Sequence, residues 1–464
     1  MAKKKKKKSQ AITMIVLFLV IIALVIGYFI AKGVAEKSNK EQNIGDTKLL
    51  KVDTSKAKTL KYSLGEKEYT LVNEDGVWKV ETEKERPLDQ NLAWQLVNRF
   101  ADMTATQVVA ENQDKLTDLG LANPALTVTL TLEDGATYSY SAGSAVVTSE
   151  GGCYAVVQGF PGIYILPHGY YTLFKEDLND LTQLPTITDI TSNKITRVKV
   201  EKDKKVLIDV AQNKETEEWV ITEPYNSSVS IDSASMGILT SSYVTFKFLK
   251  NIDYKCTDFA KYGLDTPSSE LYLEYYTKDT ASGTIKDHNL TISIGNTDED
   301  GAIYYVRVNG SDSVYTMSYS SIAALTNVDA YNFVLYTLVN TNISDLKNAT
   351  FTAQGKTYEL EITKNNADSN TNVYKLNGVD KKPSDIGTFY SKVRLIIIEK
   401  EIEKEANTNN LVFSINITDT NNKKTAYNFY EYDDIYYGVE HEGHIYFLVD
   451  KSRVDDAITS LENL

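Results

Sequence analysis

The segment "KYGLDTPSSELYLEY" (Lys261–Tyr275) decides the predicted fold, because it joins a turn to a strand pattern. Gly263 can take the positive φ that ends a helix or forms a tight turn. Pro267 then favours an extended chain at the residue before it. The residues that follow alternate between apolar and polar types, which is typical of a strand with one buried face. We therefore expect a turn at Gly263 followed by a β-strand.

The same pattern occurs earlier in the chain, in "DLGLANPALTVTL" (Asp118–Leu130). There Gly120 occupies the turn position, and Pro124 precedes the alternating residues. Two occurrences of one pattern indicate that the same structural junction is built twice.

An aromatic residue precedes each turn at a similar distance. Trp78 lies 42 residues before Gly120, and Trp219 lies 44 residues before Gly263. A third region has Tyr374 at the corresponding place but "EANTNNLVFSINI" instead of the turn. Each region opens with a hairpin pattern, continues with a helical pattern and ends with two strand patterns around a Gly-containing turn. The sequence thus predicts three copies of one unit, the third of them divergent.

The helical patterns have apolar residues at spacings of three and four. The predicted buried stripes are Leu88, Leu92, Leu96, Val97 and Phe100; Ile231, Ile238, Leu239 and Tyr243; and Ile386, Phe389, Tyr390, Val393 and Ile397. Asp89, Asp232 and Asp385 lie where a capping or first-turn carboxylate is expected, so we interpret them as structural. Pro87 and Pro383 suit a helix start.

These patterns predict an α+β chain with three related domains, each an antiparallel β-sheet with an amphipathic helix. A length of 464 residues also exceeds what one ordinary core accommodates. The predicted domains are 49–184, 185–345 and 346–464, preceded by a polar linker at 32–48.

The N-terminus predicts a location. A basic run, Lys3–Lys8, lies in a tail of residues 1–10 and precedes Ala11–Ala31, which contains 21 uncharged and mostly apolar residues. That length spans a hydrocarbon core of about 30 Å as a transmembrane helix. Lysines before the helix favour a cytoplasmic N-terminus and extracytoplasmic domains. A cleaved signal peptide is the alternative, although its apolar region would be shorter, about 7–15 residues.

Charge and cysteine content narrow the function classes. The net charge of −14 argues against a nucleic-acid partner. An exported chain that relied on disulfides would have more than two cysteines. Cys153 aligns with Tyr304 and Tyr436 of the other copies, which indicates an ordinary strand position, and one bridge to Cys256 remains the alternative.

The ordered pattern of tryptophan, helix, Gly-Leu-x-x-Pro turn and strands resembles the domain-of-unknown-function 4340 family of bacterial membrane-anchored proteins. The residues that carry it are Trp78, Gly120, Leu121, Pro124, Trp219, Tyr262, Gly263, Leu264 and Pro267. The resemblance covers about 49–340 well and the third copy weakly. It assigns no reaction and no catalytic residues. It implies a genetic context beside ABC-transporter subunits and gliding-type auxiliary proteins.

Two segments come nearest to a metal site. "NTDEDGAI" places Asn296, Asp298 and Asp300 like the start of a calcium loop, but Arg307 replaces the bidentate Glu, so we expect an acidic hairpin turn. "HEGH" offers only His441 and His444, at a turn that would point them to solvent. The sequence therefore predicts no metal and no cofactor.

No nucleophile elbow, phosphate-binding Gly-rich loop, HExxH motif or CxxC pair occurs in the sequence. We therefore expect a non-enzymatic accessory or interaction protein of a bacterial envelope complex, with an ABC transporter as one such complex. A cell-wall or polysaccharide binding module is one alternative, because clustered tyrosines could stack on sugars. These tyrosines are Tyr272, Tyr275, Tyr276, Tyr304, Tyr305 and Tyr315. An uncharacterised envelope hydrolase is the other alternative.

Overall fold

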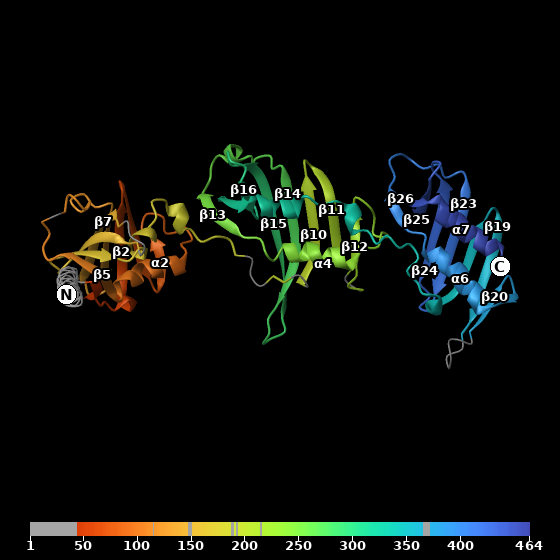
Figure 1. The fold of residues 1–464 in the computed structure, drawn as a ribbon, viewed down its shortest axis with the longest axis horizontal. Coiled ribbons are helices and arrows are strands. Elements are labelled where there is room, and N and C mark those ends of the chain that lie inside the picture. Colours follow the sequence, from red (N-terminus) through yellow and green to blue (C-terminus); the bar gives the residue numbers. More distant parts are fainter. Residues whose placement is uncertain are drawn as a thin grey trace, which may run out of the picture. The chain divides into compact units, whose positions relative to one another are not determined.

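The computed structural model describes residues 44–464 except 115, 147–150, 187–189, 192–193, 214–215 and 365–371. The predicted tail at 1–10, the predicted transmembrane helix at 11–31 and most of the predicted linker lie outside the described residues. In the part of the chain that is described, no helix is long and apolar enough to cross a membrane. The described chain is mostly β and forms three antiparallel sheets (Figure 1).

The first sheet has nine strands in the order β1-β5-β9-β8-β7-β6-β2-β3-β4. Its elements are β1 (Ile44–Leu50), β2 (Ala57–Leu64), β3 (Lys67–Glu74), β4 (Val77–Val80), α2 (Gln90–Val97), β5 (Met103–Ala110), β6 (Leu126–Leu132), β7 (Thr137–Ala145), β8 (Cys153–Val157), β9 (Ile163–Leu166) and α3 (Gly169–Thr172). Residues 44–48, the end of the predicted linker, thus belong to an edge strand that pairs with β5.

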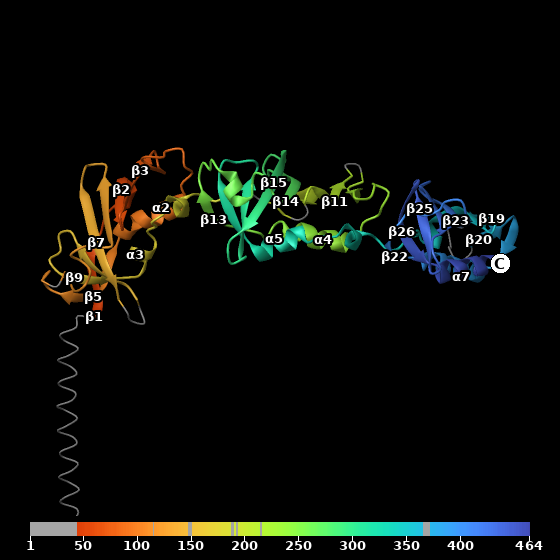
Figure 2. The same cartoon turned by 90° about the horizontal axis from the view of Figure 1, so that it is seen from above.

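The second sheet has eight strands in the order β12-β11-β10-β14-β15-β16-β17-β13. Its elements are β10 (Ile195–Lys202), β11 (Lys205–Gln212), β12 (Trp219–Glu223), α4 (Ser233–Ser242), β13 (Phe248–Asp253), β14 (Ser269–Lys278), β15 (Ile285–Thr297), β16 (Ile303–Val308), β17 (Val314–Ser318) and α5 (Tyr319–Thr326). Helices α4 and α5 lie along one face of this sheet (Figure 2).

The third sheet has nine strands in the order β21-β20-β19-β18-β23-β24-β25-β26-β22. Its elements are β18 (Leu346–Ala353), β19 (Lys356–Thr363), β20 (Val373–Leu376), β21 (Val379–Lys381), α6 (Pro383–Arg394), β22 (Ile398–Glu401), β23 (Leu411–Asp419), β24 (Lys424–Glu431), β25 (Tyr436–His441), β26 (His444–Asp450) and α7 (Lys451–Glu462).

The three strand orders coincide when β1 and β21 are set aside as extra edge strands. In each sheet the opening hairpin pairs with the strand that follows the Gly-Leu turn or its counterpart. The strand directly after the helix (β5, β13 or β22) crosses to the far edge and lies next to the last strand. Sequence reasoning missed these crossing strands and the helices that end each copy, because their partners lie far along the chain.

The chain divides into two compact units. One unit runs to Leu184 and includes Lys250–Tyr254; the other comprises Pro185–Leu249 and Lys255–Leu464. The boundaries predicted between the three domains, at 184/185 and 345/346, stay predictions.

The predicted helix caps mostly take their expected places. Asp89 caps α2 by accepting a hydrogen bond from the Leu92 N–H at 3.0 Å, and Asp232 caps α4 by accepting one from the Ser235 N–H at 2.8 Å. Asp385 lies in the first turn of α6, which begins at Pro383. The prediction for Pro87 was wrong, because α2 begins three residues later, after its Asp89 cap.

One predicted core residue of α4 is also misplaced. Ile238 is 73% exposed, whereas Met236, Leu239 and Tyr243 are buried. Spacings of three and four from Met236 select a different helical face from the one chosen around Ile238. The stripes of α2 and α6 are buried as predicted from Leu96 to Phe100 and from Ile386 to Val393.

Both Gly-Leu turns have the positive φ predicted from sequence, 71° at Gly120 and 68° at Gly263. Each turn also lies against a second glycine near the end of the neighbouring long strand. A β-carbon on Gly143 would collide with the Leu119 carbonyl oxygen, and one on Gly295 would collide with that of Tyr262. The second glycines had no signal in the sequence, because the contact joins positions more than 20 residues apart.

The third sheet makes this junction with a tyrosine. The Tyr432 hydroxyl accepts hydrogen bonds from the backbone N–H groups of Glu403 at 3.0 Å and Lys404 at 3.1 Å. In the third sheet this hydroxyl therefore holds the loop between β22 and β23, the place of the Gly-Leu turn in the other two sheets.

We predict that Gly263→Val destabilises the second sheet by more than the roughly 1–3 kcal/mol expected for backbone strain alone, since its side chain would also strike Asn296. Gly283→Val is the matched control, because Gly283 has a φ of 71° and open space around it. Calorimetric unfolding measures both. Equal shifts of the thermal midpoint would show that the contact with Asn296 is unimportant.

Candidate functional site

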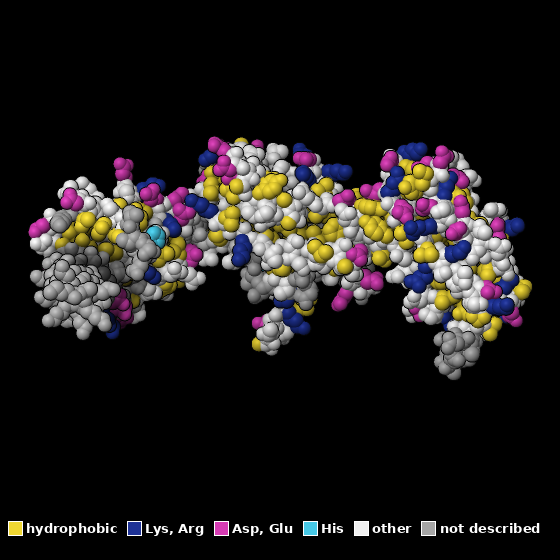
Figure 3. Space-filling view, viewed as in Figure 1, with side chains coloured by type: hydrophobic (Ala, Val, Ile, Leu, Met, Phe, Trp, Pro, Cys, Tyr) yellow, Lys and Arg dark blue, Asp and Glu magenta, His cyan; other side chains and the backbone are white. Residues whose placement is uncertain are grey.

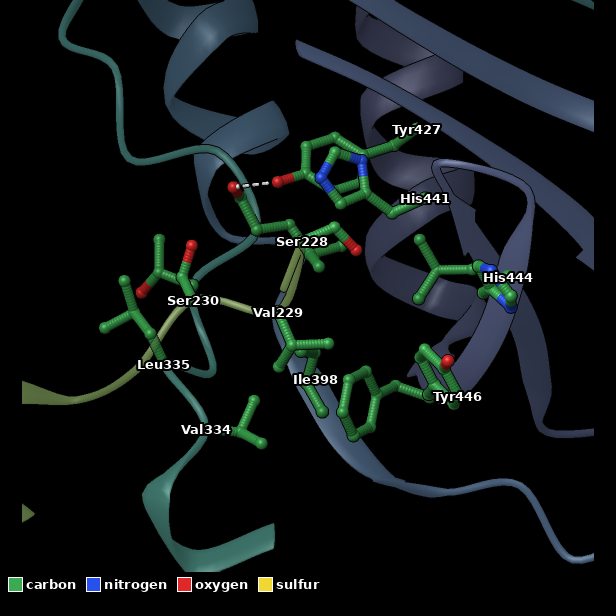
Figure 4. Close-up of a pocket in the computed structure, with 14 residues that line it drawn as sticks. Ser228, Val229, Ser230, Val334, Leu335, Ile398, Tyr427, His441, His444 and Tyr446 are labelled. Atoms are coloured by element: carbon green, nitrogen blue, oxygen red, sulfur yellow. Dashed lines mark hydrogen bonds between the residues drawn. The ribbon is translucent and has the colours of Figure 1, made fainter. Parts of the chain in front are cut away.

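Within the second unit, a cleft lies where three segments of the chain meet (Figure 4). We call it the junction cleft. It is lined by 228–230 after β12, by residues of 334–338 before β18, and by Ile398, Tyr427, Val439, His441, His444, Tyr446 and Phe447 of the third sheet. Its cavity volume of about 40 Å³ is far below the roughly 300–1,000 Å³ of small-molecule sites. The cleft is therefore a seam in a packed junction with room for water-sized molecules.

Backbone hydrogen bonds hold the segments of the junction cleft together. The Leu335 N–H donates to the Ser230 carbonyl at 2.8 Å, and the Ile398 N–H donates to the Tyr336 carbonyl at 2.8 Å. Segment 334–338 thus bonds on one side to the loop after β12 and on the other to the start of β22. These bonds make the cleft a defined part of the second unit.

Tyr225 adds a side-chain contact to the same junction. Its hydroxyl donates to the Glu401 carboxylate at 2.6 Å, and its ring meets that of Phe447 at 4.9 Å. Burial, followed by the Glu401 hydrogen bond, raises the pKa of Tyr225 well above its usual value. The phenol therefore stays protonated and acts as a donor.

Tyr427 and the two histidines form the wall of the junction cleft on the third sheet. The Tyr427 hydroxyl donates to the Leu338 carbonyl at 2.8 Å, the bond drawn in Figure 4. His441 stacks on the Tyr427 ring at 4.7 Å, and its Nδ1 lies 2.7 Å from the Ala426 carbonyl oxygen. Because a carbonyl only accepts, Nδ1 carries the proton of this hydrogen bond. Burial, and secondarily Glu442, raises the pKa of Tyr427 to about 12.

The expectation that the turn points the histidines to solvent holds for His444, which is exposed and stacks on Tyr446 at 5.4 Å, but not for His441, which is half-buried. The two residues pair across the β25–β26 hairpin. Sequence reasoning missed that both line a cleft, because the opposite wall comes from residues about 100–200 positions earlier. Across the described ranges, no three His, Cys, Asp or Glu residues gather as a metal site would require.

The "NTDEDG" segment forms the turn between β15 and β16. Asp298 Oδ1 accepts hydrogen bonds from the backbone N–H groups of Ala302 at 2.8 Å and Ile303 at 3.1 Å. The Asn296 side chain lies against Gly263, and Asp300 is exposed. An oxygen that a cation would need, Asp298 Oδ1, is thus used to stabilise the turn itself.

The other motif residues have structural contacts. Trp78 is fully buried in β4, and the Gln90 side-chain amide bonds to both its backbone N–H, at 2.8 Å, and its carbonyl, at 2.9 Å. Trp219 is half-buried at the start of β12. Pro124 and Pro267 are half-buried, each two residues before a strand begins.

Neither cysteine forms a disulfide and both are buried, so the alternative of a bridge between Cys153 and Cys256 was wrong. Burial raises the pKa of the Cys153 thiol to about 12. This thiol therefore remains neutral and is a poor nucleophile.

We expect neither "NTDEDG" nor "HEGH" to hold a metal tightly. Calorimetric titration of the purified protein with calcium and with zinc tests this. Binding at low micromolar concentration or tighter, abolished by Asp298→Ala or by His441→Ala, would contradict it. Asp298→Asn is the matched variant, since it retains an oxygen for the turn but removes the charge.

We also predict that alkaline pH loosens the junction cleft. Tyr427 has a pKa of about 12 in the folded protein and about 10 when unfolded. The stabilisation is therefore complete below about pH 10 and is lost as the pH rises towards about 12. Tyr427→Phe should lower the thermal midpoint at neutral pH, because the Leu338 hydrogen bond is lost. The thermal midpoint of this variant should also fall less than that of the unchanged protein as the pH rises towards about 12. Tyr276→Phe, on a half-buried strand position, is the control; identical alkaline curves for all three proteins would refute the prediction.

Comparisons with known proteins identify a family. No protein among the curated proteins is significantly similar to this chain. A solved structure described as "Ca2+-stabilized adhesin helps an Antarctic bacterium reach out and bind ice" has 9% identity over 89% of this chain and 88% of that chain, but its TM-score is 0.08, which supports no argument. The family model "Domain of unknown function (DUF4340)" matches residues 78–248 and 219–428, and the matches begin at Trp78 and Trp219. Since the matches cover more than half of the chain and follow its repeated pattern, the chain belongs to the DUF4340 family.

Proposed function

We propose that this protein is a single-pass, membrane-anchored interaction protein whose three related domains lie outside the cytoplasmic membrane. Residues 11–31 form the anchor in this proposal, and the basic Lys3–Lys8 run keeps the N-terminus in the cytoplasm. The shared strand order of the three sheets supports the three related domains.

The observation that carries the interaction role is a projecting ribbon at the end of β14 and β15, visible in Figure 1. We call residues 276–287 the arm. Strand β10 pairs with β14 only as far as Tyr275, and β16 pairs with β15 only from Ile292 onward. Tyr276–Lys278 and Ile285–Asp287 pair with one another, and among the described strands neither segment has a register partner on its outer edge.

The other sheets show that the fold does not need the arm. The equivalent hairpin of the first sheet ends beside β2, where Ala57 pairs with Leu132, and that of the third sheet ends beside β18, where Leu346 pairs with Asp419. The arm is therefore an addition to the second sheet. Its Ile285 is 59% exposed. Among the described strands, none pairs with the outer edge of the arm, so this edge can take a strand of another protein.

The proposed partner is a protein of a bacterial envelope complex, with an ABC transporter as the complex that the family resemblance favours. Basic and acidic side chains are interspersed on the face in Figure 3. This distribution and the net charge of −14 support a protein partner over nucleic acid. The tyrosines of the sugar-binding alternative contact their own neighbours, as Tyr304 and Tyr305 do, which supports a protein-interaction role over sugar stacking by these rings.

Labelling of an introduced cysteine tests the topology. Ala281 is exposed at the tip of the arm, and both natural cysteines are buried, so Ala281→Cys gives one accessible thiol among the described residues. A membrane-impermeant maleimide should label it in intact cells, while Lys5→Cys should react only after permeabilisation. The reverse pattern would overturn the proposed orientation.

The same Ala281→Cys variant tests the partner. A crosslinker attached to this thiol in cells should capture an envelope protein, and the capture should disappear when Ile285→Lys, which places a charge on the exposed edge of the arm, is added to the same variant. An exposed control position on the third sheet, Asn421→Cys, should not capture that protein. Equal capture from both positions, or capture that survives Ile285→Lys, would exclude the arm as the docking element.

A further inference from the structure

The two outer edges of the arm differ in the backbone groups that they present. Along an antiparallel hairpin, pairs that bond to each other alternate with pairs whose N–H and C=O groups point outward. The Asp279 N–H donates to the Thr284 carbonyl at 2.9 Å, so this pair bonds to itself. Counting from it along the register, the pairs with outward groups are Lys278 with Ile285, Tyr276 with Asp287 and Glu274 with Asn289.

The outer edge of β15 is the longer of the two. Thr291 fits the same alternation, because its N–H donates to Asn309 Oδ1 at 2.8 Å and its carbonyl accepts from the Asn309 N–H at 2.9 Å. Before this contact, the β15 residues with outward groups are Ile285, Asp287 and Asn289. Among the described residues, none hydrogen-bonds to these outward groups. Beyond its pairing with β10, β14 offers only Tyr276 and Lys278.

The side chains along this edge lie on one face of the arm. Successive side chains of a strand point to opposite faces, and Leu290 and Ile292 are buried. Ile285, Asp287 and Asn289 therefore lie on the face away from the core, and all three are exposed. Asp287 takes part in none of the ion pairs between described residues. A strand that pairs here thus meets an apolar side chain, then a carboxylate, then an amide.

A second copy of this chain fits the edge poorly. Two identical edges pair antiparallel about a twofold axis. The register that pairs all three outward residues places the two Asp287 carboxylates directly opposite each other. A shift toward the tip places the two Lys286 side chains opposite each other, and a shift toward the base leaves Ile285 without a partner. Because like charges directly opposite destabilise a strand pair, the edge favours a strand of a different protein.

We propose that the β15 edge of the arm binds an extended strand of another protein, with Lys or Arg opposite Asp287 and an apolar side chain opposite Ile285. The outward backbone groups supply the main-chain hydrogen bonds, and the alternate side chains select the strand. That the ligand is a protein rests on the proposed interaction role. The choice of edge and of charge rests on the geometry of the arm.

Tethered peptides test the charge preference on the purified full-length chain in detergent. The Ala281→Cys thiol exchanges disulfides with two competing peptides, CGGGTVTRTVT and CGGGTVTETVT, which differ only in a central Arg or Glu. Mass spectrometry at equilibrium should find the Arg conjugate favoured by at least about threefold, as a cross-strand charge pair implies. Asn421→Cys controls for the overall acidity of the chain and should show no such preference. Equal conjugates at Ala281→Cys, or the same preference at both positions, would overturn the proposal.

Four variants of the Ala281→Cys chain locate the strand. Asp287→Lys should invert the preference, whereas Glu299→Lys, the same change in the exposed turn at the other end of β15, should leave it unchanged. Asn289→Pro removes an outward N–H from β15 without removing a hydrogen bond of the hairpin, and should abolish the preference. Lys278→Pro does the same on β14 and should leave it unchanged. A preference that survives Asp287→Lys, or one that only Lys278→Pro abolishes, would contradict the assigned edge.

The results separate this inference from the proposed function. A preference on the purified chain without capture in cells would refute the proposed function alone. Capture in cells without a preference would refute the charge selection alone. Sedimentation of the purified chain as a dimer that Ile285→Lys dissociates would place a second copy on this edge and overturn the inference.

Discussion

The close approach of a Gly-Leu turn to the end of a long strand is the constraint on which the first two sheets depend. Gly120 and Gly143 in the first sheet, and Gly263 and Gly295 in the second, leave no room for a β-carbon. The turn must have positive φ, and the strand must pass directly beneath it. This contact fixes where β6 and β14 begin, and thereby the register of the sheets around them.

The third sheet reaches the same strand order without this contact. The Tyr432 hydroxyl holds the loop at Glu403 and Lys404 by two hydrogen bonds. One topology therefore tolerates two ways of closing the same junction. The copies also differ locally. The second sheet has the arm at 276–287, and the first sheet has Cys153 and His168 at the places of Tyr304 and Tyr319.

The candidate sites have different roles in the structure from those that their local sequence suggests. The sequence offers His441 and His444 as a possible metal pair. In the structure they line one wall of a cleft, and residues 228–230 and 334–338 line the other. The sequence offers Asp298 as a possible calcium ligand. In the structure it stabilises its own turn by accepting hydrogen bonds from the backbone N–H groups of Ala302 and Ile303.

The sequence by itself determined the local structure: the positive φ at Gly120 and Gly263, the caps at Asp89 and Asp232, and the opening hairpins. Each depends on residues within a few positions of one another, so its physical cause can be recognised in a short segment. Only the tertiary structure decided the crossing of β5, β13 and β22, the glycines that receive the turns, and the residues that share a cleft or cavity. Those features depend on pairing and side-chain volume between distant segments, and no local pattern encodes which of the available partners a strand or ring will meet.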